Sequence, residues 1–150
     1  CQSPFNSWIT LLGIETLSLR MKRHSENALA VAEFLEGHPN VLRVDYPALK
    51  SSKDHELYKK YFKNGASACF SFEIKGGKQA GERFANQLKL LRIVANLGDA
   101  RSMVSHPAST THSQLSEEQL LSCGISGGTI RLSIGLEDIE DIIEDLKNAL

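Results

Sequence analysis

The longest regular pattern of apolar side chains lies at the start of the chain and predicts a long helix. Ser3 followed by Pro4 is typical of a helix start, because a serine oxygen can accept hydrogen bonds from free amides and proline at the first helical position loses no bond. A kink is expected at Gly13, and residues 37–39 end the helix. The apolar stripe consists of Trp8, Leu11, Leu12, Leu17, Leu19, Met21, Ala28, Leu29, Val31, Ala32 and Leu35.

The rest of the chain alternates between short strand and helix patterns. Strand patterns cover residues 41–46, 68–74, 90–94 and 129–134, and a further short strand is compatible with residues 102–105. Helix patterns cover residues 54–62 and 78–88, a short stretch after a capping box at residues 116–119, and a last segment from about residue 137. Several connections are too short to leave all strands parallel. The order therefore predicts an α/β fold of the α+β kind, a two-layer sandwich of a small mixed or antiparallel sheet with helices on one face.

Composition narrows the class of protein. The chain has 150 residues, of which 41% are apolar, and 17 basic side chains stand against 18 acidic ones. This balance suits one domain and lacks the positive charge of a nucleic-acid-binding protein. No apolar run approaches the roughly 20 residues of a membrane helix. Cys1, Cys69 and Cys123 match neither a disulfide framework nor a metal site, so a cytoplasmic protein is expected.

The first residue raises a separate question. Because the chain begins at Cys1 rather than at Met, it is expected to be either a processed product or a piece of a longer protein. One alternative is a self-processed hydrolase in which Cys1 is the nucleophile and its own amine the base. The helix start at Ser3 argues against this, because such a nucleophile would need to begin a buried strand.

Arg131 is the first candidate for a binding residue. It lies in the predicted strand 129–134, where Ile130 and Leu132 point to one face and Arg131 to the other. A guanidinium on a strand is firmly aimed, and its fork of donors matches a carboxylate such as the α-carboxylate of an amino acid. The other interpretation is a surface arginine that pairs with an acid across the sheet. The spacing alone leaves both open.

The irregular segment from residue 95 to residue 116 is the second candidate region. Residues 96–99 (Asn-Leu-Gly-Asp) directly follow an apolar strand, where ligand sites tend to collect, although Asn, Gly and Asp also favour an ordinary turn. His106 and His112 flank a stretch rich in hydroxyls. Their spacing matches no common zinc-ligand pattern, so no metal site is predicted and structural roles are expected for both.

Six ordered blocks of the sequence resemble one family. They are SPFN (3–6), LGIETL (12–17), LRM (19–21), VANLGDA (94–100), HPASTTHSQL (106–115) and IRLSIGLED (130–138). Together they resemble the C-terminal part of the Cys/Met-metabolism family of pyridoxal-phosphate (PLP) enzymes, over essentially the whole chain. Asn96 and Thr110 replace the Ser and Met that lyases and synthases of the family usually carry. This favours the O-acetylhomoserine sulfhydrylase branch over the methionine γ-lyase, cystathionine γ-lyase and cystathionine γ-synthase branches.

The resemblance implies a division of labour between two domains. Residues 1–150 would form the C-terminal, small domain of a fold-type I PLP-dependent transferase, in which Arg131 grips the substrate α-carboxylate. Asn96 would contact that carboxylate near the cofactor lysine, Leu97 and Gly98 would shape the same wall, and Thr111 would border the substrate entrance. The Schiff-base lysine and the other cofactor-binding groups would lie in an N-terminal domain outside this chain. Lys53, in a Ser-Ser-Lys segment, follows the wrong block and is rejected as a substitute.

The resemblance also implies a reaction. The full-length enzyme would use PLP to convert O-acetyl-L-homoserine and sulfide or methanethiol into homocysteine or methionine and acetate, a step of methionine biosynthesis. It would be a homo-oligomer, expected to be a tetramer. This chain alone would bind no PLP and have no activity. A different class remains open, namely a noncatalytic binding or oligomerisation module.

Overall fold

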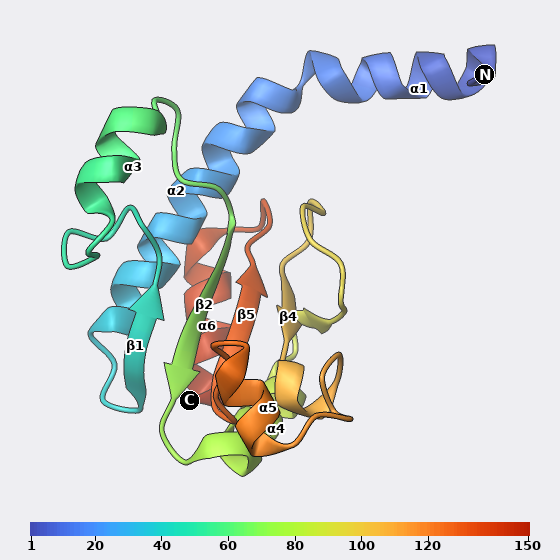
Figure 1. The fold of residues 1–150 in the computed structure, drawn as a ribbon. Coiled ribbons are helices and arrows are strands. Elements are labelled where there is room, and N and C mark those ends of the chain that lie inside the picture. The colour runs from blue at the N-terminus through green and yellow to red at the C-terminus, as the bar shows by residue number, and fades with distance from the viewer.

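The computed structural model describes residues 1–150 and contains one five-stranded sheet with helices packed on one face (Figure 1). The helices are α1 (Pro4–Glu15), α2 (Leu17–Glu36), α3 (His55–Tyr61), α4 (Gly77–Gln87), α5 (Glu117–Ser122) and α6 (Ile139–Ala149), with a 3₁₀ turn η1 (Pro107–Ser109). The strands are β1 (Val41–Asp45), β2 (Cys69–Ile74), β3 (Arg92–Ile93), β4 (Met103–Ser105) and β5 (Thr129–Ser133). The predicted two-layer α/β class is therefore confirmed.

The sheet is mixed and places β5 at its centre. The strand order is β1-β2-β5-β4-β3, and every neighbouring pair is antiparallel except β3 and β4. Arg131 on β5 lies opposite Ser71 of β2 and Ser105 of β4. Both edges of β5 are thus hydrogen-bonded to neighbouring strands, and the backbone that carries Arg131 is held on each side.

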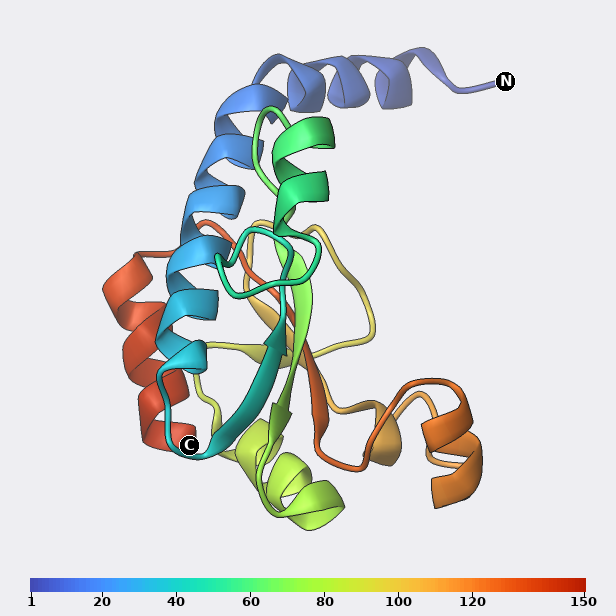
Figure 2. The same cartoon turned by 60° about the vertical axis from the view of Figure 1, so that its left-hand side comes forward.

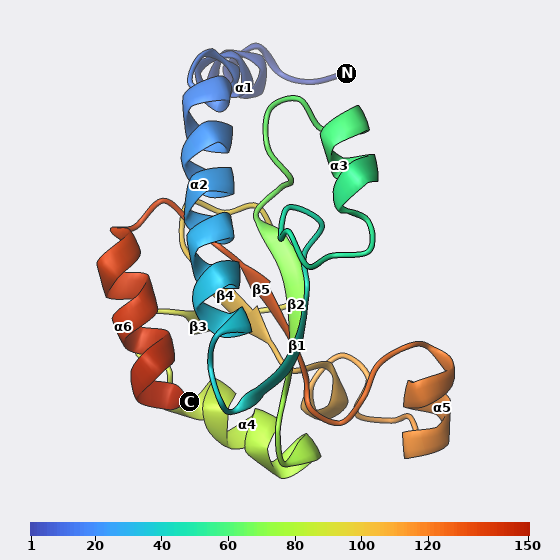
Figure 3. The ribbon, with the colours of Figure 1, turned by 90° about the vertical axis from the view of Figure 1, so that its left-hand side faces the viewer.

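The two faces of the sheet differ. Helices α2 and α6 cover one face, with α4 at one end of the sheet (Figures 2 and 3). The alternating residues of β5 that face these helices are fully buried: Ile130, Leu132 and, just beyond the strand, Ile134. Arg131 and Thr129 alternate with them and are only half buried. The chain's candidate chemistry therefore lies on the face of β5 away from the helices.

The opening helix differs from the prediction. It is two helices, and the break falls at Thr16 rather than at Gly13, with Arg20 donating hydrogen bonds to the Gly13 carbonyl and the Thr16 hydroxyl beside the break. Of the predicted apolar stripe, only Ala28, Val31, Ala32 and Leu35 on α2 are buried, and Leu29 is half buried. No residue of α1 is buried, because α1 runs away from the sheet and no other part of the chain packs around it (Figure 1).

The remaining elements lie within a few residues of their predicted bounds. Ser3 caps α1 and Ser116 forms the predicted capping box with Gln119. The largest difference is β3, which has two residues where the pattern predicted a strand over 90–94. The cause is Asp145 of α6, whose carboxylate accepts hydrogen bonds from the N–H groups of residues 89–91 and so withdraws them from strand pairing. No helix is both long and apolar enough to cross a bilayer.

Candidate carboxylate-binding site

The guanidinium of Arg131 lies against the turn formed by residues 95–98, called here the strand-end turn. Its Nη2 donates to the carbonyl oxygens of Ala95 at 2.8 Å and of Asn96 at 3.1 Å. Its Nε is enclosed and has no hydrogen-bond partner in the protein. None of the chain's ion pairs includes Arg131, and the nearby Glu73 pairs instead with Arg43. The surface ion pair considered for Arg131 is therefore absent.

A second side chain of β5 holds the other end of the strand-end turn. Ser133 is buried, and its hydroxyl oxygen accepts a hydrogen bond of 3.0 Å from the backbone N–H of Gly98. Gly98 has a φ of +80°, a conformation that glycine adopts without strain. Arg131 and Ser133 are two residues apart on one face of β5, so one rigid strand fixes both ends of the turn.

The structure brings four of the five predicted site residues together. Arg131 contacts the carbonyl of Asn96, and Leu97 and Gly98 complete the same turn, in which the Leu97 side chain is 63% exposed. Thr111 is exposed and its hydroxyl bonds the His112 ring, and no contact links it to Arg131. Sequence reasoning did not single out Ser133, although the strand alternation that selected Arg131 places Ser133 on the same face.

The arrangement suits an anion with two oxygens. A guanidinium carries a fixed positive charge and five N–H donors in one plane, and Arg131 uses only Nη2 on protein acceptors. The two carbonyl oxygens hold the plane of the fork in place while leaving its charge without a carboxylate partner. Nη1 has no acceptor in the protein and is the donor left for a ligand oxygen, and a bidentate contact also needs one N–H of Nη2 to exchange its carbonyl for the ligand.

His106 has the structural role expected for it. Its ring is fully buried, with Nδ1 at 2.7 Å from the Ser109 hydroxyl and Nε2 at 2.8 Å from the Gly127 carbonyl. Both nitrogens are occupied within the protein, so the imidazole ties η1 to the segment before β5. It makes no metal cluster, and no group of three potential metal ligands occurs in the structure.

We predict that Gly81→Ala destabilises the fold through His106. A Cβ at position 81 would lie 2.5 Å from His106 Nε2, and the buried ring cannot move without losing its two hydrogen bonds. Overpacking of this kind costs about 1–3 kcal/mol. Urea unfolding should show the loss, whereas Gly13→Ala, where a Cβ meets no atom within 4 Å, should show none. Equal unfolding midpoints for Gly81→Ala and the unsubstituted chain would contradict this account.

The family model described as "Cys/Met metabolism PLP-dependent enzyme" matches residues 1–150. The chain belongs to this family. Its enzymes depend on PLP, and the chain combines the family's sequence blocks with the Arg131 site described above.

Relatives within the family are named for different activities. The chain is 51% identical to an O-acetyl-L-homoserine sulfhydrylase of Leptospira meyeri, over 99% of this chain and 34% of the relative. It is 44% identical to an L-methionine gamma-lyase of Fusobacterium nucleatum, over 98% of this chain and 37% of the relative. A crystal structure of an O-acetylhomoserine (thiol)-lyase from Campylobacter jejuni, which contains a pyridoxyl-lysine phosphate, superposes with a TM-score of 0.89 at 52% identity. That alignment covers 97% of this chain and 35% of the other.

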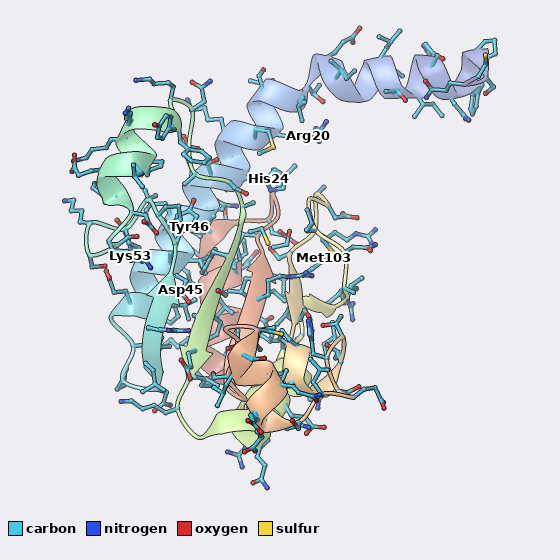
Figure 4. The ribbon with its side chains drawn as sticks, in the orientation of Figure 1. Arg20, His24, Asp45, Tyr46, Lys53 and Met103 are labelled. Carbon is cyan, nitrogen blue, oxygen red and sulfur yellow. The ribbon has the colours of Figure 1, made fainter.

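The chain thus spans about a third of the length of the relatives that it matches. No hydrogen bond of Arg131 or of the strand-end turn involves a lysine. Every lysine of the chain is exposed, and Lys53 lies in the loop next to β1, at the opposite side of the sheet from β4 and its Met103 (Figure 4).

Proposed function

We propose that this chain is the C-terminal, substrate-carboxylate-binding domain of an O-acetylhomoserine sulfhydrylase. The full-length enzyme would convert O-acetyl-L-homoserine and sulfide or methanethiol into homocysteine or methionine and acetate. The observation that carries the proposal is the Arg131 guanidinium, which is held by the Ala95 and Asn96 carbonyls and has no acid partner in the chain. The choice of substrate is supported by the relatives that are named O-acetyl-L-homoserine sulfhydrylase.

In this proposal Arg131 acts by binding and orientation. A bidentate contact fixes two oxygens of the α-carboxylate, and this sets the direction of the amino group and of the carbon chain that carries the acetyl leaving group. Asn96, Leu97 and Gly98 form the wall beside that carboxylate, and Thr111 borders the entrance. When bound, PLP supplies an electron sink for the elimination and replacement at the γ-carbon.

The cofactor lysine is proposed to lie in an N-terminal domain that is not part of this chain. Besides the length of the relatives, the surface of α1 supports this. Phe5, Trp8 and Leu11 are each more than half exposed, and apolar residues are found all round the helix. A helix that is apolar on every side is typical of one buried in a larger protein, so α1 fits a contact with the missing portion.

We predict that the 150-residue chain alone binds no PLP and catalyses no sulfhydrylation, because the cofactor lysine is proposed to lie in the other domain. Titration of the purified chain with PLP, followed by absorbance at the imine band, should show only free cofactor. Stoichiometric uptake with an imine spectrum would contradict the assignment of the cofactor lysine to another domain.

The activity is tested on the full-length protein, expressed from its gene together with the upstream coding sequence. O-acetyl-L-homoserine with sulfide should give homocysteine and acetate, whereas L-methionine alone should give little product. Rapid release of methanethiol from methionine would instead favour the γ-lyase alternative, which the names of several relatives motivate. An upstream sequence without a cofactor lysine would favour the noncatalytic binding or oligomerisation module. Light scattering of the same sample tests the proposed tetramer. The cytoplasmic location stays a prediction.

A further inference from the structure

We propose that Glu137 is a positioning residue for the Arg131 site, acting through the loop that contains the strand-end turn. The inference rests on the proposed function, since it assigns a role in binding the substrate carboxylate. Glu137 lies four residues beyond the end of β5, in the segment 134–137 that connects β5 to α6. It touches neither Arg131 nor the strand-end turn, so its effect has to be transmitted.

The first step of transmission is a two-point contact with Ser102. The Glu137 carboxylate accepts hydrogen bonds from the Ser102 backbone N–H at 2.7 Å and from the Ser102 hydroxyl at 2.9 Å. The same hydroxyl oxygen accepts a hydrogen bond of 2.8 Å from the N–H of Gly135. Ser102 is fully buried. Each Ser102 donor has its own oxygen of the Glu137 carboxylate, so a side chain with two acceptor oxygens is matched to this position.

The second step is the loop itself. The loop begins at Ala95 and ends at Ser102. Besides the contact of Ser102 with Glu137, further hydrogen bonds join this loop to β5 and to segment 134–137. Arg131 donates to the carbonyls of Ala95 and Asn96, and the Ser133 hydroxyl accepts from the N–H of Gly98. Further along, the N–H of Leu136 donates to the carbonyl of Ala100 at 2.8 Å. The loop is therefore held along its length, and Glu137 holds its last residue.

The anchor for Glu137 is helix α2. The Asn27 side-chain amide donates to the carbonyls of Gly135 at 3.1 Å and Glu137 at 3.0 Å, and the His24 ring lies 2.7 Å from the carbonyl of Ile134. Figure 4 shows His24 on α2 beside the connection between β5 and α6. Segment 134–137 is thus fixed on the core side, so the Glu137 carboxylate is a rigid point against which the loop is placed.

Loss of this point is expected to loosen the loop between its two ends. The Ala95 and Asn96 carbonyls that orient the Arg131 guanidinium would then sample a wider range of positions. The guanidinium would therefore spend a smaller fraction of time in the orientation that binds a carboxylate. The expected effect is on substrate binding, with a rise in KM and little change in kcat.

The test uses the full-length protein with PLP bound, and the variants Glu137→Ala and Glu137→Gln. Glu137→Gln keeps the shape of the side chain but points an NH₂ group at the Ser102 hydroxyl, which then has no acceptor for its own hydrogen. This variant is used where Glu137→Ala folds poorly. We expect the KM for O-acetyl-L-homoserine to rise about tenfold, which corresponds to one hydrogen bond to a charged group, with kcat changed less than about twofold. Backbone hydrogen exchange should in addition show faster exchange at Gly98, whose N–H Glu137 does not touch.

The matched control is Asp145→Ala. Asp145 also accepts several backbone N–H groups, at residues 89–91, but it lies on α6 and contacts no part of loop 95–102. It should lower the melting temperature and leave both the KM and the exchange at Gly98 unchanged. A wild-type KM in both Glu137 variants, with a raised KM in an Arg131 variant, would overturn the role of Glu137 and leave the proposed function standing. An equal rise in KM for Asp145→Ala would overturn it as well.

An inactive wild-type enzyme would instead count against the proposed function. In that case the exchange rate at Gly98 still decides the coupling, because it needs no turnover. Unchanged exchange at Gly98 in Glu137→Gln would show that Glu137 does not order the strand-end turn.

Discussion

Arg131→Lys in the full-length protein is expected to raise the KM for O-acetyl-L-homoserine about a hundredfold, an effect of about 3 kcal/mol for the loss of a bidentate charged contact. Lysine keeps the positive charge but presents one ammonium group, which cannot hold two carboxylate oxygens in a plane. An ammonium that donates to the carbonyls of Ala95 and Asn96, as Nη2 does, has one N–H left for the substrate. Steady-state kinetics with sulfide at saturation measures the change directly.

The control for this substitution is Arg43→Lys. Arg43 is also a strand arginine, on β1, but it pairs with Asp45 and Glu73 and is not in contact with the strand-end turn. Its replacement should leave the KM unchanged and cost less than about 1 kcal/mol of stability, as exposed ion pairs do. The assignment of the α-carboxylate to Arg131 fails if Arg131→Lys binds the substrate as tightly as the wild type.

Local patterns in the sequence were sufficient for most of the architecture. The alternation of β5 identified which of its residues enter the core, and it also placed Arg131 on the opposite face. The Ser116 capping box and the Ser3-Pro4 helix start were read correctly because a cap depends on three or four neighbouring residues only. All of these patterns depend on residues that are close to one another in the sequence.

The features that the sequence did not predict depend on partners far along the chain. Strand β3 is short because Asp145, more than fifty residues away, binds the N–H groups that precede it. The contact between Glu137 and Ser102 joins residues 35 positions apart, and neither residue type signals it. Trp8 and Leu11 belong to the predicted apolar stripe but are exposed in this chain, because an apolar pattern indicates that a helix is covered and does not identify the segment that covers it.

Leu132→Ala is expected to give the largest loss of stability, about 2–5 kcal/mol, with no comparable change in the Arg131 site. Leu132 is fully buried at the centre of the sheet, opposite Phe70 on β2 and Val104 on β4, so the cavity left behind can be filled only by moving hydrogen-bonded strands.

Urea unfolding of the chain measures the loss. The control Leu121→Ala, at a position 64% exposed, should have a free energy of unfolding within about 0.5 kcal/mol of wild type. Leu132 and Arg131 are adjacent on one strand and point to opposite faces. Leu132→Ala should therefore lower the free energy of unfolding at an unchanged KM, while the main effect of Arg131→Lys should be on the KM. A variant of Leu132 that unfolds at the wild-type urea concentration would contradict the position of the core on this face of β5.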